Sequence, residues 1–153
     1  DRFTFHHHEK VGAQYAETIG RRLKLANAER ERIVWLVDKH QYLADARAMR
    51  PSKLKAVLFH PGIDELLTLH RADALATPRN VDHVEYCERM LQTWTAADLN
   101  PEPLLRGDDL RGLPIARGPR YREILDEVRE AQLDGAVATR EEALALARRL
   151  AEA

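Results

Sequence analysis

Residues 9–40, EKVGAQYAETIGRRLKLANAERERIVWLVDKH, decide the fold class because their apolar side chains recur with a helical period. In the first half of this stretch, four apolar residues follow one another at intervals of four and therefore share one face of a helix: Val11, Tyr15, Ile19 and Leu23. This helix is predicted over residues 9–25.

A second helix is predicted to begin at Asn27, because its side-chain oxygen can accept a hydrogen bond from an unpaired amide of the first turn. The inward face of this helix is predicted from apolar residues at i, i+3 and i+4 and a histidine at i+7: Ile33, Leu36, Val37 and His40. His40 is therefore expected on the buried side of the helix.

The helical pattern continues along the chain, and no segment alternates convincingly with period two. We predict further helices over about residues 51–60, 63–76, 81–97, 108–112, 119–134 and 139–153. In the helix that contains Asp73, this side chain lies on the same stripe as the apolar residues and is expected to point inward. The predicted fold class is all-α, a multi-helix bundle followed by a small helical C-terminal subdomain.

Prolines and glycines mark one clear boundary in this series of helices. The stretch DLNPEPLLRGDD, residues 98–109, holds two prolines and a glycine, which is typical of a break between packed units. We predict a helical domain over residues 1–98, a linker over 99–106 and a subdomain over 107–153. In the last of these, residues 139–142 read TREE, the pattern of a helix capping box.

Composition narrows the class of protein. The 153 residues carry 24 basic and 25 acidic side chains, so nucleic-acid binding would be confined to a local patch.

Cys87 is the only cysteine, which excludes an intrachain disulfide and favours a reducing compartment. No stretch approaches the roughly 20 apolar residues of a membrane span, so we expect no membrane association and a cytoplasmic location. The only methionines are Met49 and Met90, so we expect the chain to be a fragment of a longer protein.

Residues 106–122, RGDDLRGLPIARGPRYR, form the most basic segment. Five arginines stand against two aspartates here, an excess of three positive charges in a nearly neutral chain: Arg106, Arg111, Arg117, Arg120 and Arg122. Arginine can bind phosphate oxygens through two parallel hydrogen bonds, and the amides at the start of the helix after Gly118 add an anion site. The segment therefore suits an RNA backbone. The other interpretation is a solvated face whose arginines pair with Asp108, Asp109 and Glu123.

Three possible metal ligands stand on separate helices. His8 begins the first helix, while His40 and Asp73 lie on the predicted inward faces of two others, so the three could converge on a divalent ion. A buried histidine bonded to a buried aspartate would satisfy the same groups without a metal. Histidines at a chain end can also belong to a tag. His60 and His83 have no evident partner in the sequence.

Two stretches resemble one family. Residues 5–40, which contain a His-Glu pair ahead of a Val-Gly-Ala helix, resemble the region after the HD dyad in bacterial CCA-adding enzymes, the tRNA nucleotidyltransferases of the poly(A) polymerase superfamily. Residues 103–146 are similar to the C-terminal RNA-binding region of that family, with its G-x-D-L, G-P and T-R-E-E landmarks. The resemblance covers nearly the whole chain.

The resemblance implies a partial HD-type helical domain. His8, His40 and Asp73 would be the later members of its metal pattern, and the first histidine and the His-Asp dyad are absent from this chain. A site that lacks the bridging aspartate is under-charged, so a divalent metal would bind weakly and no cofactor tightly. The family's Gly-Ser and D-x-D signature is also absent. Nucleotide transfer, which uses Mg²⁺ with ATP or CTP in the family, would therefore need a missing N-terminal head, and we expect no catalytic residue here.

The resemblance implies that this chain positions tRNA for 3′-end nucleotide addition, with Arg106, Arg111, Arg117, Gly118, Arg120 and Arg122 at the RNA. Phosphate contacts fix register without reading bases, as an enzyme that acts on every tRNA requires. The family often has Pro-Gly-Pro where this chain has Arg117-Gly118-Pro119. Two other interpretations stay open, a fragment of an HD-domain phosphohydrolase and a plain helical interaction module. The sequence does not decide between CCA and poly(A) addition, nor does it give the oligomeric state.

Overall fold

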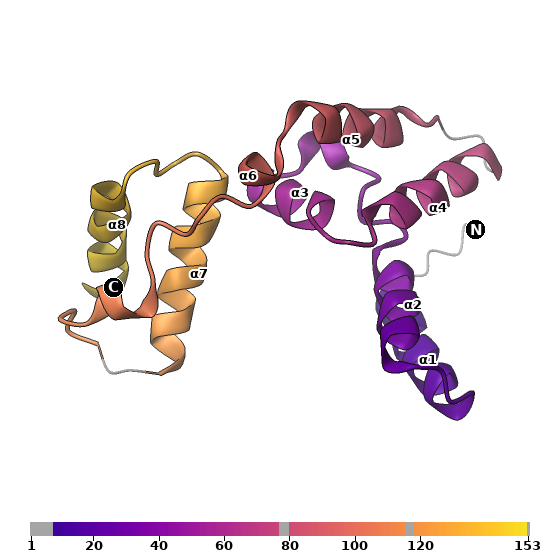
Figure 1. Ribbon diagram of the computed structural model, residues 1–153, viewed down its shortest axis with the longest axis horizontal. Helices are drawn as coiled ribbons and strands as arrows, with labels where there is room; N and C mark the ends of the chain where they lie inside the picture. Colours follow the sequence, from indigo (N-terminus) through magenta and orange to yellow (C-terminus); the bar gives the residue numbers. More distant parts are fainter. Residues whose placement is uncertain (1–7, 77–79, 116–117, 153) are drawn as a thin grey trace, which may run out of the picture. The chain divides into compact units, whose positions relative to one another are not determined.

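The computed structural model describes residues 8–76, 80–115 and 118–152. In these ranges every regular element is helical and no strand is present, which confirms the all-α class. The elements, shown in Figure 1, are α1 (His8–Arg22), α2 (Asn27–Lys39), the 3-10 helix η1 (Ala46–Ala48), α3 (Pro51–Leu58), α4 (Ile63–Ala76), α5 (Asp82–Thr93), α6 (Ala96–Leu99), the 3-10 helix η2 (Gly107–Leu110), α7 (Pro119–Leu133) and α8 (Arg140–Glu152).

The contacts divide the chain into two compact units. The first, called the N-terminal unit, comprises residues 1–48 and 60–93, and the second, the C-terminal unit, comprises residues 49–59 and 94–153. Residues 49–59 therefore group with the C-terminal unit, whereas the sequence placed them within 1–98. The division into a domain, a linker and a subdomain stays a prediction.

The capping box predicted at the last helix is present. The Thr139 hydroxyl accepts a hydrogen bond from the Glu142 amide at 3.2 Å, and the Glu142 carboxylate accepts one from the Thr139 amide at 3.1 Å. These two bonds satisfy donors that the first turn of a helix leaves without partners, so α8 begins where the sequence indicates. The amides of Ala138 and Thr139, which both donate to the Glu142 carboxylate, lower the pKa of Glu142.

Two other helix boundaries differ from the prediction. Asn27 is the first residue of α2 and not its N-cap, and the preceding amide of Ala26 is bound by the Glu29 carboxylate at 3.1 Å. The helix predicted over residues 81–97 ends at Thr93, and α6 starts after Thr95. Thr95 and Asp98 form a second capping box there, so a helix start interrupts the apolar pattern.

In the N-terminal unit, α1 and α2 form a hairpin in which the two helices lie side by side (Figure 1). Their contact uses small residues of α1. A Cβ atom at Gly12 would lie 3.1 Å from Val37, and one at Gly20 would lie 2.9 Å from the Arg30 side chain. Ala13 is also buried. The two helices can therefore approach closely because α1 presents small residues to α2.

The C-terminal unit has its own apolar core between α7, α8 and η2. Its buried members are Leu105, Leu110, Ile124, Val128, Val137, Ala143 and Ala147. The Tyr121 hydroxyl donates to the Leu110 carbonyl at 2.9 Å, which fixes η2 against the first turn of α7. The predicted basic segment is thus attached to a packed core.

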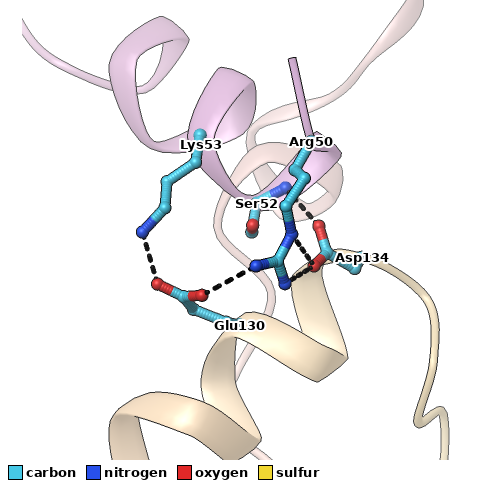
Figure 2. A network of polar contacts seen from close by, with 5 residues as sticks. All are labelled: Arg50, Ser52, Lys53, Glu130 and Asp134. Atoms are coloured by element: carbon cyan, nitrogen blue, oxygen red, sulfur yellow. Dashed lines mark hydrogen bonds and ion pairs between the residues drawn. The ribbon is translucent and has the colours of Figure 1, made fainter. Parts of the chain in front are cut away.

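A polar network joins α3 to the end of α7 within the same unit (Figure 2). The Asp134 carboxylate accepts a hydrogen bond from the Ser52 amide at 2.7 Å and from Arg50 Nε at 3.1 Å. Lys53 and Arg50 both pair with Glu130. Since Ser52 lies in the first turn of α3, Asp134 acts as the N-terminal cap of a helix 82 residues away in sequence.

Over the described ranges, no helix combines the length and the apolar character that crossing a membrane requires.

Candidate functional site

Two of the three predicted metal ligands meet in the N-terminal unit. His8 Nε2 lies 3.1 Å from His40 Nε2, and the two rings are arranged edge to face. His40 Nδ1 is 2.7 Å from the Val37 carbonyl, which can only accept, so Nδ1 carries the proton. A neutral His40 then presents the lone pair of Nε2 to His8. The helix pair α1–α2 thus positions both imidazoles.

A second histidine pair lies in the same unit. His70, which is 4% exposed, places Nδ1 3.3 Å from His83 Nε2 and Nε2 3.2 Å from the Lys39 carbonyl. The carbonyl requires a proton on Nε2, so Nδ1 accepts from His83. Burial lowers the pKa of His70 and keeps the ring neutral near pH 7. The prediction that His83 has no evident partner is therefore wrong.

His40, His70 and His83 border a polar pocket of about 630 Å³ within this unit. Its lining is His40, Gln41, Ala44, Asp45, His70, Asp73, Ala74, Asn80 and His83. Asp73 is exposed at the rim and is not buried on an inward stripe as the sequence predicted. His70 and Asp73 lie about one turn apart on α4, so their side chains point in similar directions. His70 is buried, whereas Asp73 is exposed at the edge of the pocket.

The geometry of His8 and His40 fits two ligands of one ion. Two nitrogens that each lie about 2.1 Å from a metal are about 3.0 to 3.4 Å apart when the angle at the metal is about 90° to 110°, and their observed separation is 3.1 Å. The hydrogen bond from His40 Nδ1 to a backbone carbonyl is the usual support of a histidine ligand. Within the described ranges, however, no group of three or more His, Cys, Asp or Glu side chains is arranged to hold a metal ion.

Acidic neighbours flank the predicted RNA-binding arginines in the C-terminal unit. Arg111 pairs with Asp108, and Arg106 pairs with Glu102 at 3.3 Å. These side chains are all at least 60% exposed, and exposed ion pairs contribute about 0 to 1 kcal/mol. Such pairs are weak enough for a phosphate to replace the carboxylate. Over residues 102–123, two flanking glutamates reduce the excess of positive charge from three to one.

The arginines at the start of α7 differ in their surroundings. Arg120 pairs with Glu123 at 3.2 Å and donates to the Leu150 carbonyl at the end of α8, so it also holds two helices together. Arg122 is exposed, and no residue in the described ranges forms a hydrogen bond or ion pair with it. Gly118 is exposed and directly precedes α7. Arg117 lies outside the described residues.

Residues 107–109, Gly-Asp-Asp, lie in η2, and Asp109 caps the start of this helix. The Asp109 carboxylate accepts a hydrogen bond from the Arg106 amide at 2.6 Å and pairs with Arg140 at the start of α8. The pKa of Asp109 is lowered, first by the Arg106 amide and then by Arg140. Asp109 therefore links η2 to α8, and its charge is paired with Arg140 in addition to lying beside the arginines of residues 106–122.

Sequence reasoning missed an aromatic contact in the N-terminal unit. The His60 ring stacks on Trp35 with centroids 3.6 Å apart and planes 11° from parallel, and its Nδ1 accepts from the Gly62 amide at 3.0 Å. Burial lowers the pKa of His60. The His-Pro-Gly turn at residues 60–62 is the signal that could have indicated a fixed ring, because it holds the histidine at the start of α4.

Two known tRNA nucleotidyltransferases are similar in sequence to this chain. Over 162 aligned residues, the chain is 33% identical to an A-adding tRNA nucleotidyltransferase of Deinococcus radiodurans, a match that covers 99% of this chain and 36% of the relative. Over 48 residues, it is 54% identical to an A-adding tRNA nucleotidyltransferase of Geobacter sulfurreducens, covering 31% of this chain and 6% of that relative. No family profile matches the chain. No solved structure matches it either.

The first of these matches shows that the chain is similar to a tRNA nucleotidyltransferase over nearly its whole length, which confirms the resemblance to these enzymes. The particular relatives that it matches are both named A-adding enzymes. The chain spans about a third of the length of the Deinococcus relative.

Proposed function

We propose that this chain is the tRNA-binding part of a longer tRNA nucleotidyltransferase and positions tRNA for the addition of A at its 3′ end. The observation that carries the proposal is the similarity to A-adding enzymes along 99% of the chain. The D-x-D pair that holds Mg²⁺ and nucleotide in the family does not occur in the sequence, so transfer from ATP or CTP requires a head domain outside this chain, and the chain alone is inactive.

The start of α7 supports the assignment of the RNA contact. Arg111 directly follows η2, and Arg120 and Arg122 lie in the first turn of α7, where Tyr121 binds η2 and Arg120 binds the end of α8. A surface held in this way loses little conformational entropy when phosphate binds. Arg122 needs no rearrangement because it has no ion pair among the described residues, so we propose it as the principal phosphate contact. The predicted contacts of Arg106, Arg117 and Gly118 stay part of the proposal.

We expect Arg122→Glu to weaken tRNA binding about fivefold to tenfold at moderate salt and to reduce the slope of log K against log salt by about one. A lost phosphate contact releases one counterion fewer, and the new carboxylate adds repulsion. Binding is measured by fluorescence anisotropy with labelled tRNA across a salt series. Unchanged affinity and slope would remove Arg122 from the interface.

The control for this experiment is Arg89→Glu. Arg89 is exposed on α5 in the other unit, so this variant makes the same change in net charge away from the proposed surface. Its expected effect on tRNA affinity is less than twofold. An equal loss in both variants would mean that net charge, and not a local contact, governs binding. Arg120→Glu is less informative because its bond to the Leu150 carbonyl would also be lost.

A second function is favoured by the separation of His8 and His40. We propose that these two imidazoles and Asp73 belong to an HD-type metal site whose remaining ligands lie outside the chain. At the site the metal would supply a bound water for phosphate-ester hydrolysis, and His40 would be oriented by the Val37 carbonyl. The pocket of about 630 Å³ bordered by His40 and Asp73 is large enough for a phosphate ester.

Metal titration tests this second proposal. Because His8 and His40 supply only two ligands, we expect Zn²⁺ to bind this chain weakly, with His40→Ala lowering the affinity at least tenfold in calorimetry. His60→Ala is the matched control, since His60 stacks on Trp35 away from the pair. Equal affinities of the wild type and the His40→Ala variant would contradict the assignment.

A further inference from the structure

Helix α1 carries an apolar face that nothing in the described ranges covers. Tyr15 is 65% exposed, Leu23 62%, Ile19 51% and Val11 49%. These four side chains, called the α1 stripe, recur every fourth residue, and Leu23 directly follows the last residue of α1, so they form one continuous strip along the helix and its end. Soluble proteins scatter single apolar side chains over their surfaces, whereas a contiguous strip of large ones marks an interaction site.

The α1 stripe is distinct from the contact between α1 and α2. That contact uses Gly12, Ala13 and Gly20, whose small size allows α2 to approach. The large residues of α1 are left on the adjacent part of the helix surface. A helix that needed to pack only on α2 would gain nothing from large apolar residues here, because exposed polar residues at these positions would serve equally well.

We propose that the α1 stripe is the docking face for a helix from the part of the longer enzyme that this chain does not span. The length of the relatives supports this occupant, since the chain accounts for only 36% of the Deinococcus protein that it matches from end to end. The inference rests on the proposed function, because it requires that the chain belongs to such an enzyme.

The stripe also indicates the chemistry of the occupant. Its side chains are one aromatic and three aliphatic residues at intervals of four, which pack against an amphipathic helix with large aliphatic residues at the same spacing. Arg22 is exposed and lies seven positions after Tyr15, on the same face. An acidic residue at the edge of the docked helix would complement this arginine.

Thiol labelling can test the inference because the chain has one inert cysteine. Cys87 is fully buried, and burial raises its pKa to about 11, so its thiol does not react near pH 7. In residues 1–153 the thiol of Tyr15→Cys is then the sole reactive thiol, and in the longer protein its modification is followed at residue 15 itself. We expect it to react with a maleimide at least tenfold more slowly in the product of the full reading frame than in residues 1–153 alone.

The matched control is Gln14→Cys, one residue earlier and exposed on the polar side of α1. Its thiol should react within twofold at the same rate in both proteins. Equal rates for Tyr15→Cys in the two proteins would overturn the inference. A reading frame that encodes only these 153 residues would overturn it as well. Protection within residues 1–153 that rises with protein concentration would also overturn it, because a second copy would then cover the stripe.

The tRNA affinity of the same full-length variants separates this inference from the proposed function. Rapid labelling of Tyr15→Cys in a longer protein that binds tRNA would remove only the docking face. A protected thiol in a longer protein that does not bind tRNA would remove only the proposed function.

Discussion

Ile124→Ala is expected to lower the free energy of unfolding of the C-terminal unit by about 3 kcal/mol, because removing a buried isoleucine leaves a cavity as well as losing apolar burial. Ile124 is completely buried in the core between α7, α8 and η2. The buried residues that α8 contributes to this core are two alanines, Ala143 and Ala147. Neighbouring residues can therefore fill the cavity only in part.

Urea unfolding read by tryptophan fluorescence measures this loss for one unit. Trp94 belongs to the C-terminal unit and Trp35 to the N-terminal unit, so a Trp35→Phe background reports the C-terminal unit alone. Glu127→Ala is the control, because Glu127 is exposed on α7 three residues after Ile124 and should change stability by less than about 0.5 kcal/mol. A loss below about 1 kcal/mol in Ile124→Ala would show that this core is not packed as described.

The second large effect is expected for Asp134→Ala, which should destabilise the C-terminal unit by about 2 kcal/mol. The substitution leaves the Ser52 amide without its acceptor and removes the partner of Arg50 (Figure 2). A hydrogen bond to a charged group contributes about 1.5 to 3 kcal/mol, and the lower half of this range applies because Arg50 is largely exposed. The same fluorescence assay measures the loss, which would be absent if α3 did not pack on α7.

The effect of Asp134→Ala should also depend on pH. Burial alone would raise the pKa of Asp134, but the Ser52 amide and Arg50 outweigh it and lower the pKa. The stabilisation is therefore fully present above the unfolded-state pKa of about 3.9 and is lost as the pH falls through the lower folded-state value. Wild type and Asp134→Ala should converge in stability under strong acid. A difference that persists below both pKa values would contradict a role for the carboxylate charge.

The sequence predicted the features that depend on local chemistry. The helical class follows from the apolar period, and the start of α8 follows from Thr139 and Glu142, whose side chains reach only their own first turn. The break before α6 was missed even though Thr95 and Asp98 carry the same signal. An apolar run that continued through Trp94 concealed it.

Features that depend on distant partners could not be predicted. Asp134 caps a helix that begins more than 80 residues earlier, and no local pattern connects the two. At the histidine pocket, the helical period placed Asp73 inward, although packing buries His70 and leaves Asp73 exposed. A stripe of residues shows which face of a helix is apolar, but the neighbouring elements decide whether that face is covered.

The predicted arginine segment illustrates a further limit. Counting residues 106–122 gave three excess positive charges, but Arg106 pairs with Glu102, and Arg120 pairs with Glu123 as the alternative interpretation predicted. Charge counts treat a segment as isolated, whereas ion pairs draw on the flanking residues. Arg106, Arg111 and Arg120 each have an acidic partner, and only the contacts show that Arg122 has none among the described residues.

We propose that this chain binds tRNA, and a titration across salt concentrations is the direct test. Binding of residues 1–153 to an unfractionated tRNA pool is compared with binding to a DNA duplex of matched charge. We expect preferential binding of tRNA, with a slope that corresponds to a few released counterions. Equal affinity for the two polymers, or no binding to either, would contradict it.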